Sequence, residues 1–412
     1  MRYDIFDYYK SYFGEEGENM FQIKTLDAFD VTGFAGDAFR LTESDTPDAV
    51  LVRSTKVPDE LISEHLLLVA RSGIGTNTIN VDACTANGTA VFNTPGANAN
   101  AVKELIIQCL FYCGRPLFPA LSATRQLQAD NLQAAAEGIR KSFVGQELYG
   151  KTVGILGLGA IGQRLANACY HLGMQVLGYN RSFKNLQHVL QLENINDVLE
   201  QADFVVLLLP LNAETTHMMS TAQFRLMKDS AFLLNFGRAE LVDDDAVKEG
   251  LHQRQFAHYI TDFPQNDLKD EPQITMLPHL GGNTKEALSN SANLTLQNTL
   301  DFLEAGTIRS SVNFPPVDLP FTSPYRFTLF FKTRNNFWSD VSDVLYHFEL
   351  PMQEMMGNTR GEYGYTVVNT TINKLNQAPE QVETILAALH GIPGMIRVRL
   401  LANPSDLVTT PI

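Results

Sequence analysis

The chain has 412 residues, of which 44% are hydrophobic, and a formal net charge of −15. At about 150 residues per domain, this length predicts two or three domains. The acidic balance disfavours nucleic acid as a partner, because duplex binding depends on cations that neutralise phosphates. Apolar runs such as residues 204–209 are far shorter than the roughly 20 residues of a membrane span, and the amino terminus lacks a signal-peptide pattern. We therefore expect a cytoplasmic protein that engages neither nucleic acid nor a membrane.

The four cysteines, Cys84, Cys109, Cys113 and Cys169, form no CxxC pair. Cys109 and Cys113 stand one helical turn apart in an apolar run, which favours buried free thiols over metal ligands. We expect no metal site.

Short apolar runs alternate with helical patterns from Phe21 to Val312, which is typical of βαβ units and parallel sheets. The strands of a first, smaller unit are predicted at 21–26, 49–54, 66–73 and 90–94. Those of a second unit are predicted at 152–159, 174–180, 204–211, 231–238, 258–263 and 274–279. Residues 101–128 predict one long apolar helix that joins the units, and residues 284–305 predict a helix that returns to the first. Two linked Rossmann-like lobes with a cleft between them are expected.

The proline-rich stretch from Val312 to Arg326 predicts an extended linker. Beyond it the pattern reads β, α, β, β, α, β, the order of a ferredoxin-like sandwich. The fold class predicted is α/β, with two doubly wound Rossmann-like lobes and a C-terminal ferredoxin-like domain. The predicted divisions are 20–102 with 285–312 for the substrate domain, 103–284 for the nucleotide domain, 313–325 for the linker, 326–412 for the last domain and 1–19 for an extension that fits no strand.

The stretch from Val153 to Ser182 places a GxGxxG turn directly after a strand and at the start of a helix. Such a turn lets the free N–H groups of the helix face a dinucleotide pyrophosphate. Its residues are Gly157, Gly159, Ala160, Ile161 and Gly162.

Asn180 ends the second strand, where a carboxylate would ordinarily bind the adenosine ribose. An amide can still bond a hydroxyl but does not repel a 2′-phosphate, and Arg181 with Ser182 could contact one. We expect NAD as the cofactor, with NADP left open.

Three polar residues follow strands of the second unit: Arg238, Asp262 and His279. In open α/β sheets, ligands bind beyond the carboxyl ends of the strands. An imidazole that titrates near neutrality suits a general base, so His279 is the candidate to take a hydroxyl proton. The guanidinium of Arg238 can hold a carboxylate through two hydrogen bonds. A nearby acid would orient the imidazole.

The chain resembles the D-2-hydroxyacid dehydrogenase family over residues 20–412, and within it the branch that oxidises 3-phospho-D-glycerate. The resemblance rests on RSGIGTNTINVD (71–82), VFNTPGANANAVKEL (91–105), GLGAIG (157–162), NFGRAELVD (235–243), TDF (261–263) and PHLGGNT (278–284). It implies an Arg, acid, His catalytic set formed by Arg238, Asp267 and His279. Aspartate is one methylene shorter than the family glutamate, and Glu271 is the alternative acid.

The resemblance also implies the binding residues. For the cofactor it adds Pro210, Gly237 and Asp262 to the glycine turn. For a small anionic substrate it implies a basic cluster in the first unit, formed by Arg53, Ser54 and Lys56. It also implies backbone donors at Gly73, Ile74 and Gly75 and a side-chain contact from Asn98. Lys103 is a candidate for further positive charge and could equally be an exposed helix lysine.

The last domain resembles an ACT domain, an amino-acid-sensing module. Where serine-sensing members have an NxPG turn, residues 333–336 read TRNN. Without the glycine, the turn loses conformational freedom. We therefore expect a role in assembly rather than strong serine inhibition, and a homodimer or homotetramer.

Three functions remain possible at this point. The first is NAD-dependent oxidation of 3-phospho-D-glycerate to 3-phosphohydroxypyruvate, the first step of serine synthesis. The second is reduction of other 2-oxo acids such as 2-oxoglutarate, because a basic cluster does not separate a phosphate from a second carboxylate. The third is a dinucleotide-sensing scaffold without catalysis.

Overall fold

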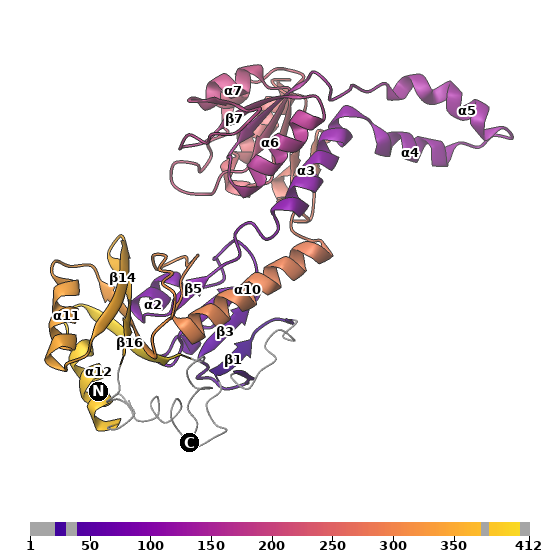
Figure 1. Ribbon diagram of the computed structural model, residues 1–412. Coiled ribbons are helices and arrows are strands. Elements are labelled where there is room, and N and C mark those ends of the chain that lie inside the picture. Colours follow the sequence, from indigo (N-terminus) through magenta and orange to yellow (C-terminus); the bar gives the residue numbers. More distant parts are fainter. Residues whose placement is uncertain (1–20, 30–38, 372–378, 404–412) are drawn as a thin grey trace. The chain divides into compact units, whose positions relative to one another are not determined.

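The structure is a computed structural model that describes residues 21–29, 39–371 and 379–403. The amino-terminal extension expected at 1–19 lies outside these residues. The chain divides into two compact units, which are described separately (Figure 1). The first unit comprises residues 1–95 with 289–412, and the second comprises residues 96–288.

The first unit contains a parallel sheet with the strand order β2-β1-β3-β4-β5. Its strands are β1 (Phe21–Thr25), β2 (Phe39–Leu41), β3 (Ala49–Val52), β4 (Leu68–Arg71) and β5 (Ala90–Phe92). Successive residues along a strand belong alternately to two apolar clusters, one on each face of the sheet. Leu296, Phe302 and Leu303 of helix α10 (Lys285–Ala305) cover one face, and Cys84 of helix α2 (Val81–Ala86) lies in the cluster on the other.

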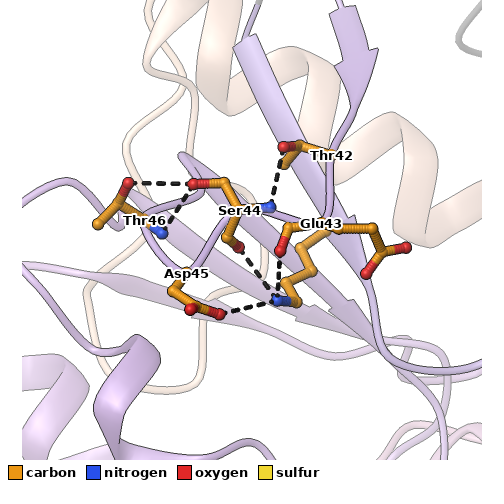
Figure 2. Close-up of polar contacts among 6 residues, drawn as sticks. Thr42, Glu43, Ser44, Asp45 and Thr46 are labelled. Atoms are coloured by element: carbon orange, nitrogen blue, oxygen red, sulfur yellow. Dashed lines mark hydrogen bonds and ion pairs between the residues drawn. The ribbon is translucent and has the colours of Figure 1, made fainter.

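Lys24 of the first unit binds the loop between β2 and β3 (Figure 2). The ammonium group of Lys24 donates to the carbonyl oxygens of Glu43 and Ser44 at 3.0 and 3.1 Å. It also lies 3.3 Å from the carboxylate of Asp45. Lys24 therefore stabilises this loop. The sequence pattern did not indicate this role.

The second unit contains a parallel sheet with the strand order β12-β11-β10-β9-β6-β7-β8. Its strands are β6 (Thr152–Leu156), β7 (Gln175–Tyr179), β8 (Leu190–Leu192), β9 (Phe204–Leu207), β10 (Phe232–Asn235), β11 (His258–Thr261) and β12 (Ile274–Met276). Its covering helices are α3 (Ala99–Gly114), α6 (Ala160–His171), α7 (Ile195–Gln201), α8 (Thr221–Phe224) and α9 (Asp244–His252). The chain order reverses between β6 and β9, so a ligand crevice is expected beyond the carboxyl ends of these strands.

The single long helix predicted at 101–128 is wrong, because the structure has two helices there. Helix α3 ends at Gly114, and α4 (Leu117–Gln126) begins after Pro116 at an angle of 62°. Proline cannot continue a helix, and the residue before it is driven to extended backbone, as Arg115 shows with φ −134° and ψ 123°. With α5 (Leu132–Ile139) and the 3₁₀ turn η3 (Arg140–Phe143), α4 forms an arm that projects from the second unit (Figure 1).

The C-terminal sheet, defined here as β13–β16, is antiparallel with the order β14-β15-β13-β16. Its elements are β13 (Tyr325–Lys332), α11 (Phe337–His347), β14 (Met352–Arg360), β15 (Tyr363–Thr370), α12 (Pro379–His390) and β16 (Met395–Ala402). This is the predicted ferredoxin-like order, and the predicted α/β fold class is confirmed. The stretch predicted as a linker is packed in the first unit, where Phe314 and Val317 are buried.

The four cysteines are free thiols, as expected. Burial raises the pKa of the Cys84, Cys109 and Cys169 thiols to about 12, which keeps them protonated and unreactive. Within the described part of the chain, no single helix is long and apolar enough to cross a membrane. The bent pair α3 and α4 reaches that length and composition only when the two are taken together.

Candidate functional site

The glycine turn of the second unit has the local geometry that a pyrophosphate requires. Gly157 has φ +112°, and a Cβ there would lie 2.8 Å from the backbone of Leu208. A Cβ on Gly162 would collide with the carbonyl oxygen of Gly157, whereas Gly159 faces open space within 4 Å. Helix α6 begins at Ala160 with no side-chain cap on its first N–H groups. An uncapped helix N-terminus with open space before it fits a dinucleotide phosphate.

Asn180 lies directly beside this turn. The backbone N–H of Leu158 donates to Asn180 Oδ1 at 3.2 Å, and the N–H of Gly157 donates to the carbonyl oxygen of Tyr179 at 2.9 Å. Arg181 and Ser182 are exposed on the following loop. After β9, Pro210 is also exposed at the carboxyl edge of the sheet.

The three polar residues predicted at strand ends follow adjacent strands. Arg238 comes three residues after β10, Asp262 directly follows β11, and His279 comes three residues after β12. Neighbouring strands lie about 4.8 Å apart, so β10 and β12 are separated by about 10 Å. The structure therefore gathers these side chains at one edge of the second unit, on the same side as the glycine turn.

Two buried polar residues support the backbone of Arg238. The amide of Asn235 donates to the carbonyl oxygen of Arg238 at 2.8 Å and to the hydroxyl of Tyr259 at 3.2 Å. Asn235 Oδ1 accepts the N–H of Gly237 at 3.1 Å. Burial raises the pKa of Tyr259 to about 12, so the phenol stays neutral. A Cβ on Gly237 would lie 2.6 Å from Leu241 and 2.9 Å from the Leu209 carbonyl oxygen, so this turn requires glycine.

The buried carboxylate of Asp262 holds the loop that carries His279. It accepts the N–H of Leu280 at 2.7 Å and the N–H of Gly281 at 2.8 Å. Burial raises the pKa of Asp262 above its ordinary value, and the two N–H groups oppose that rise. His279 itself is exposed, adopts φ +56°, and meets Phe263 edge to face with 5.1 Å between ring centroids. Asp262 thus fixes the backbone directly after His279, whose ring stays exposed.

The acid expected to pair with His279 stays a prediction. Asp267 is exposed on the 3₁₀ turn η5 (Asn266–Leu268). Glu271, the alternative, lies 3.0 Å from His252 Nε2 and is engaged there. Both acids belong to the segment between β11 and β12, which also precedes His279.

Two candidate substrate residues lie in the second unit. Asn98 precedes α3, and its Oδ1 is buried without a hydrogen-bond partner among the described residues. A Cβ on Gly282 would lie 2.8 Å from Asn98 Nδ2, so the carboxamide packs against the loop after His279. Lys103 of α3 is largely buried, with 18% of its side chain exposed, and lies 3.4 Å from Glu104. Lys103 is therefore not the exposed helix lysine that sequence reasoning held equally possible.

The remaining substrate candidates lie in the first unit on two loops. Arg53, Ser54 and Lys56 are exposed after β3. The carboxylate of Asp27 accepts the backbone N–H groups of Arg53, Ser54 and Thr55 at 2.6, 3.0 and 3.3 Å. Thr55 adds a hydroxyl donor to the same carboxylate at 2.9 Å. Asp27 therefore organises the basic loop.

The second loop, residues 73–75, is tied to the first by Arg71. Its guanidinium donates to the carbonyl oxygen of Arg53 at 3.0 Å and to that of Gly75. The N–H of Gly73, expected to bind a substrate carboxylate, instead donates to Thr94 Oγ1 at 2.9 Å. Ile74 and Gly75 remain the candidate backbone donors of this loop.

Sequence reasoning missed the residues that hold these loops, namely Asp27, Arg71, Asn235 and Tyr259. Asp27 and Arg71 stand at or just beyond the carboxyl ends of strands, the same signal that identified Arg238. Asn235 is the last residue of β10 and carried this signal too, whereas Tyr259 lies inside β11 and did not. Within the described ranges, no group of three or more His, Cys, Asp or Glu side chains is placed to hold a metal ion.

The sequence is similar to known proteins. Residues 117–281 match the family model of the NAD-binding domain of D-isomer-specific 2-hydroxyacid dehydrogenases. D-3-phosphoglycerate dehydrogenase of Escherichia coli is 30% identical over 362 residues, 84% of this chain and 85% of that protein. The D-3-phosphoglycerate dehydrogenase of Methanocaldococcus jannaschii is 31% identical over 66% of this chain, and the match spans 52% of its own length.

A solved structure shows the same fold. The NAD complex of a D-isomer-specific 2-hydroxyacid dehydrogenase from Lactobacillus delbrueckii ssp. bulgaricus has a TM-score of 0.60, with 22% identity, over 71% of this chain and 100% of that chain. The chain therefore belongs to the D-isomer-specific 2-hydroxyacid dehydrogenase family, and the stretch that matches the NAD-binding domain of that family lies within the second unit.

Proposed function

We propose that the protein oxidises 3-phospho-D-glycerate to 3-phosphohydroxypyruvate with NAD as the hydride acceptor, the first step of serine synthesis. The observation that carries this proposal is the grouping of Arg238, Asp262 and His279 on adjacent strand ends beside an uncapped glycine turn. The relatives named D-3-phosphoglycerate dehydrogenase support the substrate, as does the exposed basic loop with Arg53 and Lys56.

The three polar residues at the strand ends of the second unit have different roles in this reaction. Bound nicotinamide supplies the acceptor for the hydride that leaves the carbon bearing the hydroxyl group. The exposed imidazole of His279 takes the hydroxyl proton, a step that contributes on the order of 10² to 10⁴ in rate. The guanidinium of Arg238 binds the substrate carboxylate and stabilises charge on the forming carbonyl oxygen. Asp262 holds the loop that carries His279 through the N–H groups of Leu280 and Gly281.

The first unit would supply recognition of the phosphate. Arg53 and Lys56 provide charge, and Ser54 provides a hydroxyl donor, on a loop whose backbone N–H groups are already bound by Asp27. Such a preorganised loop loses little conformational freedom on binding. A local basic cluster of this kind would attract an anionic substrate to a chain whose net charge is −15.

A matrix of substrates tests the proposal. The purified protein is assayed with 3-phospho-D-glycerate, D-2-hydroxyglutarate and D-lactate, and in reverse with the corresponding 2-oxo acids. We expect the highest kcat/KM for the phosphorylated acid, and a fall in kcat of about 10² or more for His279→Gln. A higher kcat/KM for 2-oxoglutarate would assign the reductase function instead. If no acid is turned over while the protein still binds ADP-ribose, the result would favour a dinucleotide-sensing scaffold without catalysis.

We further propose that the protein is a homo-oligomer in which the arm of the second unit contacts a second copy. Neither α4 nor α5 has a buried residue, although both carry large apolar side chains. Leu117, Phe118, Leu121 and Leu132 are 57, 58, 44 and 51% exposed. Exposed apolar groups gathered on one projecting element are typical of protein interfaces.

A further inference from the structure

Tyr259 lies inside β11, the strand between β10, which precedes Arg238, and β12, which precedes His279. Its side chain is buried in an apolar cluster of the second unit. A phenylalanine would fill nearly the same volume there, and a buried hydroxyl costs free energy unless it is hydrogen-bonded. The hydroxyl of Tyr259 therefore requires partners, and these stand at the carboxyl ends of the strands.

Two polar residues on adjacent strands bind this hydroxyl. Asn235, the last residue of β10, donates to it from Nδ2 at 3.2 Å. The side chain of Thr261, the last residue of β11, is its second hydrogen-bond partner. Asn235 and Thr261 are paired in register, and Tyr259 stands two residues before Thr261. The three side chains therefore point to the same face of the sheet.

On the side of β10, these hydrogen bonds continue to the turn of Arg238. Asn235 Nδ2 donates to the carbonyl oxygen of Arg238 at 2.8 Å, and Asn235 Oδ1 accepts the N–H of Gly237 at 3.1 Å. An amide group has two hydrogens, so one serves the turn and the other serves Tyr259. The carboxamide of Asn235 thus joins the tyrosine hydroxyl to the backbone that carries the candidate substrate anchor.

On the side of β11, the hydrogen bonds lead to the ring that contacts His279. The hydroxyl oxygen of Thr261 accepts the N–H of Phe263 at 3.1 Å. The ring of Phe263 meets the His279 ring edge to face, with 5.1 Å between centroids. Aromatic pairs have preferred geometries, so this contact restrains the plane of the imidazole. One chain of contacts therefore runs from the backbone of Arg238 through Tyr259 to the ring of His279.

Burial makes this chain of contacts sensitive to the loss of one hydroxyl group. The side chains of Asn235, Tyr259 and Thr261 are at most 2% exposed. Water therefore cannot readily replace a lost hydrogen bond. The strands themselves would stay paired, because the backbone N–H of Asp262 donates to the carbonyl oxygen of Asn235 at 3.1 Å without any side chain. Removal of the hydroxyl should displace the loops and leave the sheet intact.

We propose that Tyr259 is a positioning residue of the reaction, because its hydroxyl couples the turn of Arg238 to the Phe263 ring beside His279. Since Tyr259 is buried, it acts only through these neighbours. This role rests on the proposed function, in which Arg238 binds the substrate carboxylate and His279 takes the hydroxyl proton.

Tyr259→Phe removes the hydroxyl and keeps the ring. We expect kcat, measured with the acid that the parent protein turns over best, to fall about tenfold, because small displacements of catalytic groups are amplified in rate. The dissociation constant of ADP-ribose should change by less than about twofold. Burial raises the pKa of Tyr259 to about 12, so the phenol is neutral and the fall in kcat should be the same from about pH 6 to pH 9.

The matched control is Tyr365→Phe, which removes another buried tyrosine hydroxyl. The Tyr365 hydroxyl donates to the carbonyl oxygen of Gly306 at 2.5 Å, in the first unit. The control should lower the midpoint of thermal unfolding, as Tyr259→Phe does, and leave kcat within about twofold of the parent. Equal falls in kcat for the two variants would reduce the effect at Tyr259 to general destabilisation and overturn the proposal.

Changes at Thr261 test whether the two hydroxyls act as one chain. Thr261→Val should lower kcat about as much as Tyr259→Phe, and Thr261→Ser, which keeps the hydroxyl, should retain most of the parent kcat. The double variant Tyr259→Phe with Thr261→Val should lose no more than about twofold beyond either single variant, because both remove the same link. Losses that multiply in the double variant would overturn the proposal, as would a kcat of Tyr259→Phe within about twofold of the parent.

A readout without turnover separates this proposal from the proposed function. The ring signal of His279 is observed by NMR in protein with isotope-labelled histidine and is assigned by its absence in His279→Gln. We expect this signal to shift in Tyr259→Phe and to stay in place in Tyr365→Phe. If the parent protein turns over none of the acids, the proposed function fails, and the NMR shift still decides the coupling. An unmoved His279 signal in Tyr259→Phe would overturn it.

Discussion

At the scale of single residues, each unit has a carboxylate that binds the backbone N–H groups of a candidate functional loop. Asp27 binds three N–H groups of the basic loop, and Asp262 binds two of the loop that carries His279. In both cases the acid lies just beyond a strand and holds a loop that carries a candidate functional side chain. Both acids thus act on backbone N–H groups and leave the candidate functional side chains exposed.

Asp27 offers a prediction at this scale. In Asp27→Asn a neutral amide oxygen replaces the charged acceptor of the N–H groups of Arg53 and Ser54, so these hydrogen bonds weaken and the basic loop should loosen. We expect the KM for the phosphorylated substrate to rise about tenfold, with less than about twofold change in kcat. The matched control is Asp45→Asn, because Asp45 lies in a neighbouring loop of the same unit with its side chain 95% exposed (Figure 2). Equal effects of the two substitutions would contradict the assignment.

The pH dependence of this effect has a definite sign. Burial tends to raise the pKa of Asp27, but the N–H groups of Arg53 and Ser54 and the donors of Thr55 hold the pKa below its ordinary value of 3.8. Because the pKa is lowered, the stabilisation that the carboxylate gives the loop is fully present above the unfolded-state pKa. That stabilisation is lost as the pH falls through the folded-state pKa. The KM ratio between variant and parent should therefore stay constant from about pH 5 to pH 9. A ratio that collapses between pH 5 and 6 would show that another group is responsible.

At the scale of elements, the break at Pro116 converts one predicted helix into an arm. The arm leaves the apolar side chains of Leu117, Phe118 and Leu121 exposed on α4. A bend that exposes apolar side chains raises the free energy of the isolated chain unless a partner covers them.

The arm gives a prediction about assembly. Leu117 and Leu121 are one helical turn apart and share a face of α4. The double substitution Leu117→Ser and Leu121→Ser should convert the oligomer to a monomer in size-exclusion chromatography with light scattering. Gln126→Ser, a polar change at the end of the same helix, should leave the mass unchanged. A parent protein that is already monomeric, or a variant that keeps its mass, would argue against this interface.

At the scale of the whole chain, arginines join the C-terminal sheet to the rest of the first unit. Arg326, with no exposed surface, donates to the carbonyl oxygens of Ala305 and Leu319, each at 2.7 Å. Arg399 donates to those of Phe302 and Leu303 at 3.3 and 3.0 Å. The last carbonyl groups of a helix lack partners within it and carry partial negative charge, so these guanidinium groups cap α10. The C-terminal sheet is therefore packed as part of the first unit.

Burial lowers the pKa of the Arg326 guanidinium to about 10, which leaves it charged at neutral pH. In Arg326→Met, the carbonyl oxygens of Ala305 and Leu319 and the side-chain oxygen of Asn369 lose their donor. We expect the free energy of unfolding to fall by about 3 kcal/mol, because each unsatisfied buried acceptor costs about 1 kcal/mol or more. Denaturant titration followed by the fluorescence of Trp338, the only tryptophan, measures this loss.

Arg360→Met is the matched control for that measurement. Arg360 also donates to carbonyl oxygens, those of Ser311 and Val312 at 2.6 and 3.0 Å, but it is exposed. Water can replace its hydrogen bonds, so the expected loss is below about 1 kcal/mol. Equal losses for the two variants would show that burial does not decide the contribution of these arginines.

The ACT-like turn illustrates a limit of the sequence reading. The lack of a glycine at residues 333–336 predicts a loss of conformational freedom, yet Asn336, directly before α11, adopts φ +63°. Asparagine tolerates this backbone better than most residues. The guanidinium of Arg334, in the same turn, donates to the carbonyl oxygen of Pro393 and to the carboxylate of Asp340. A role in assembly rather than serine binding stays a prediction.

The sequence by itself determined the two parallel series of strands, the glycine turn, and the three polar residues at adjacent strand ends. These depend on local periodicity and on backbone sterics, which residues near one another in the chain encode. Only the tertiary structure decided that Asp27 holds Arg53, that Glu271 meets His252, and that Arg399 caps a helix 97 residues away. Hydrogen bonds of this kind join residues that are distant in the chain, and a side chain's partner is set by which backbone groups the packed elements leave unsatisfied beside it.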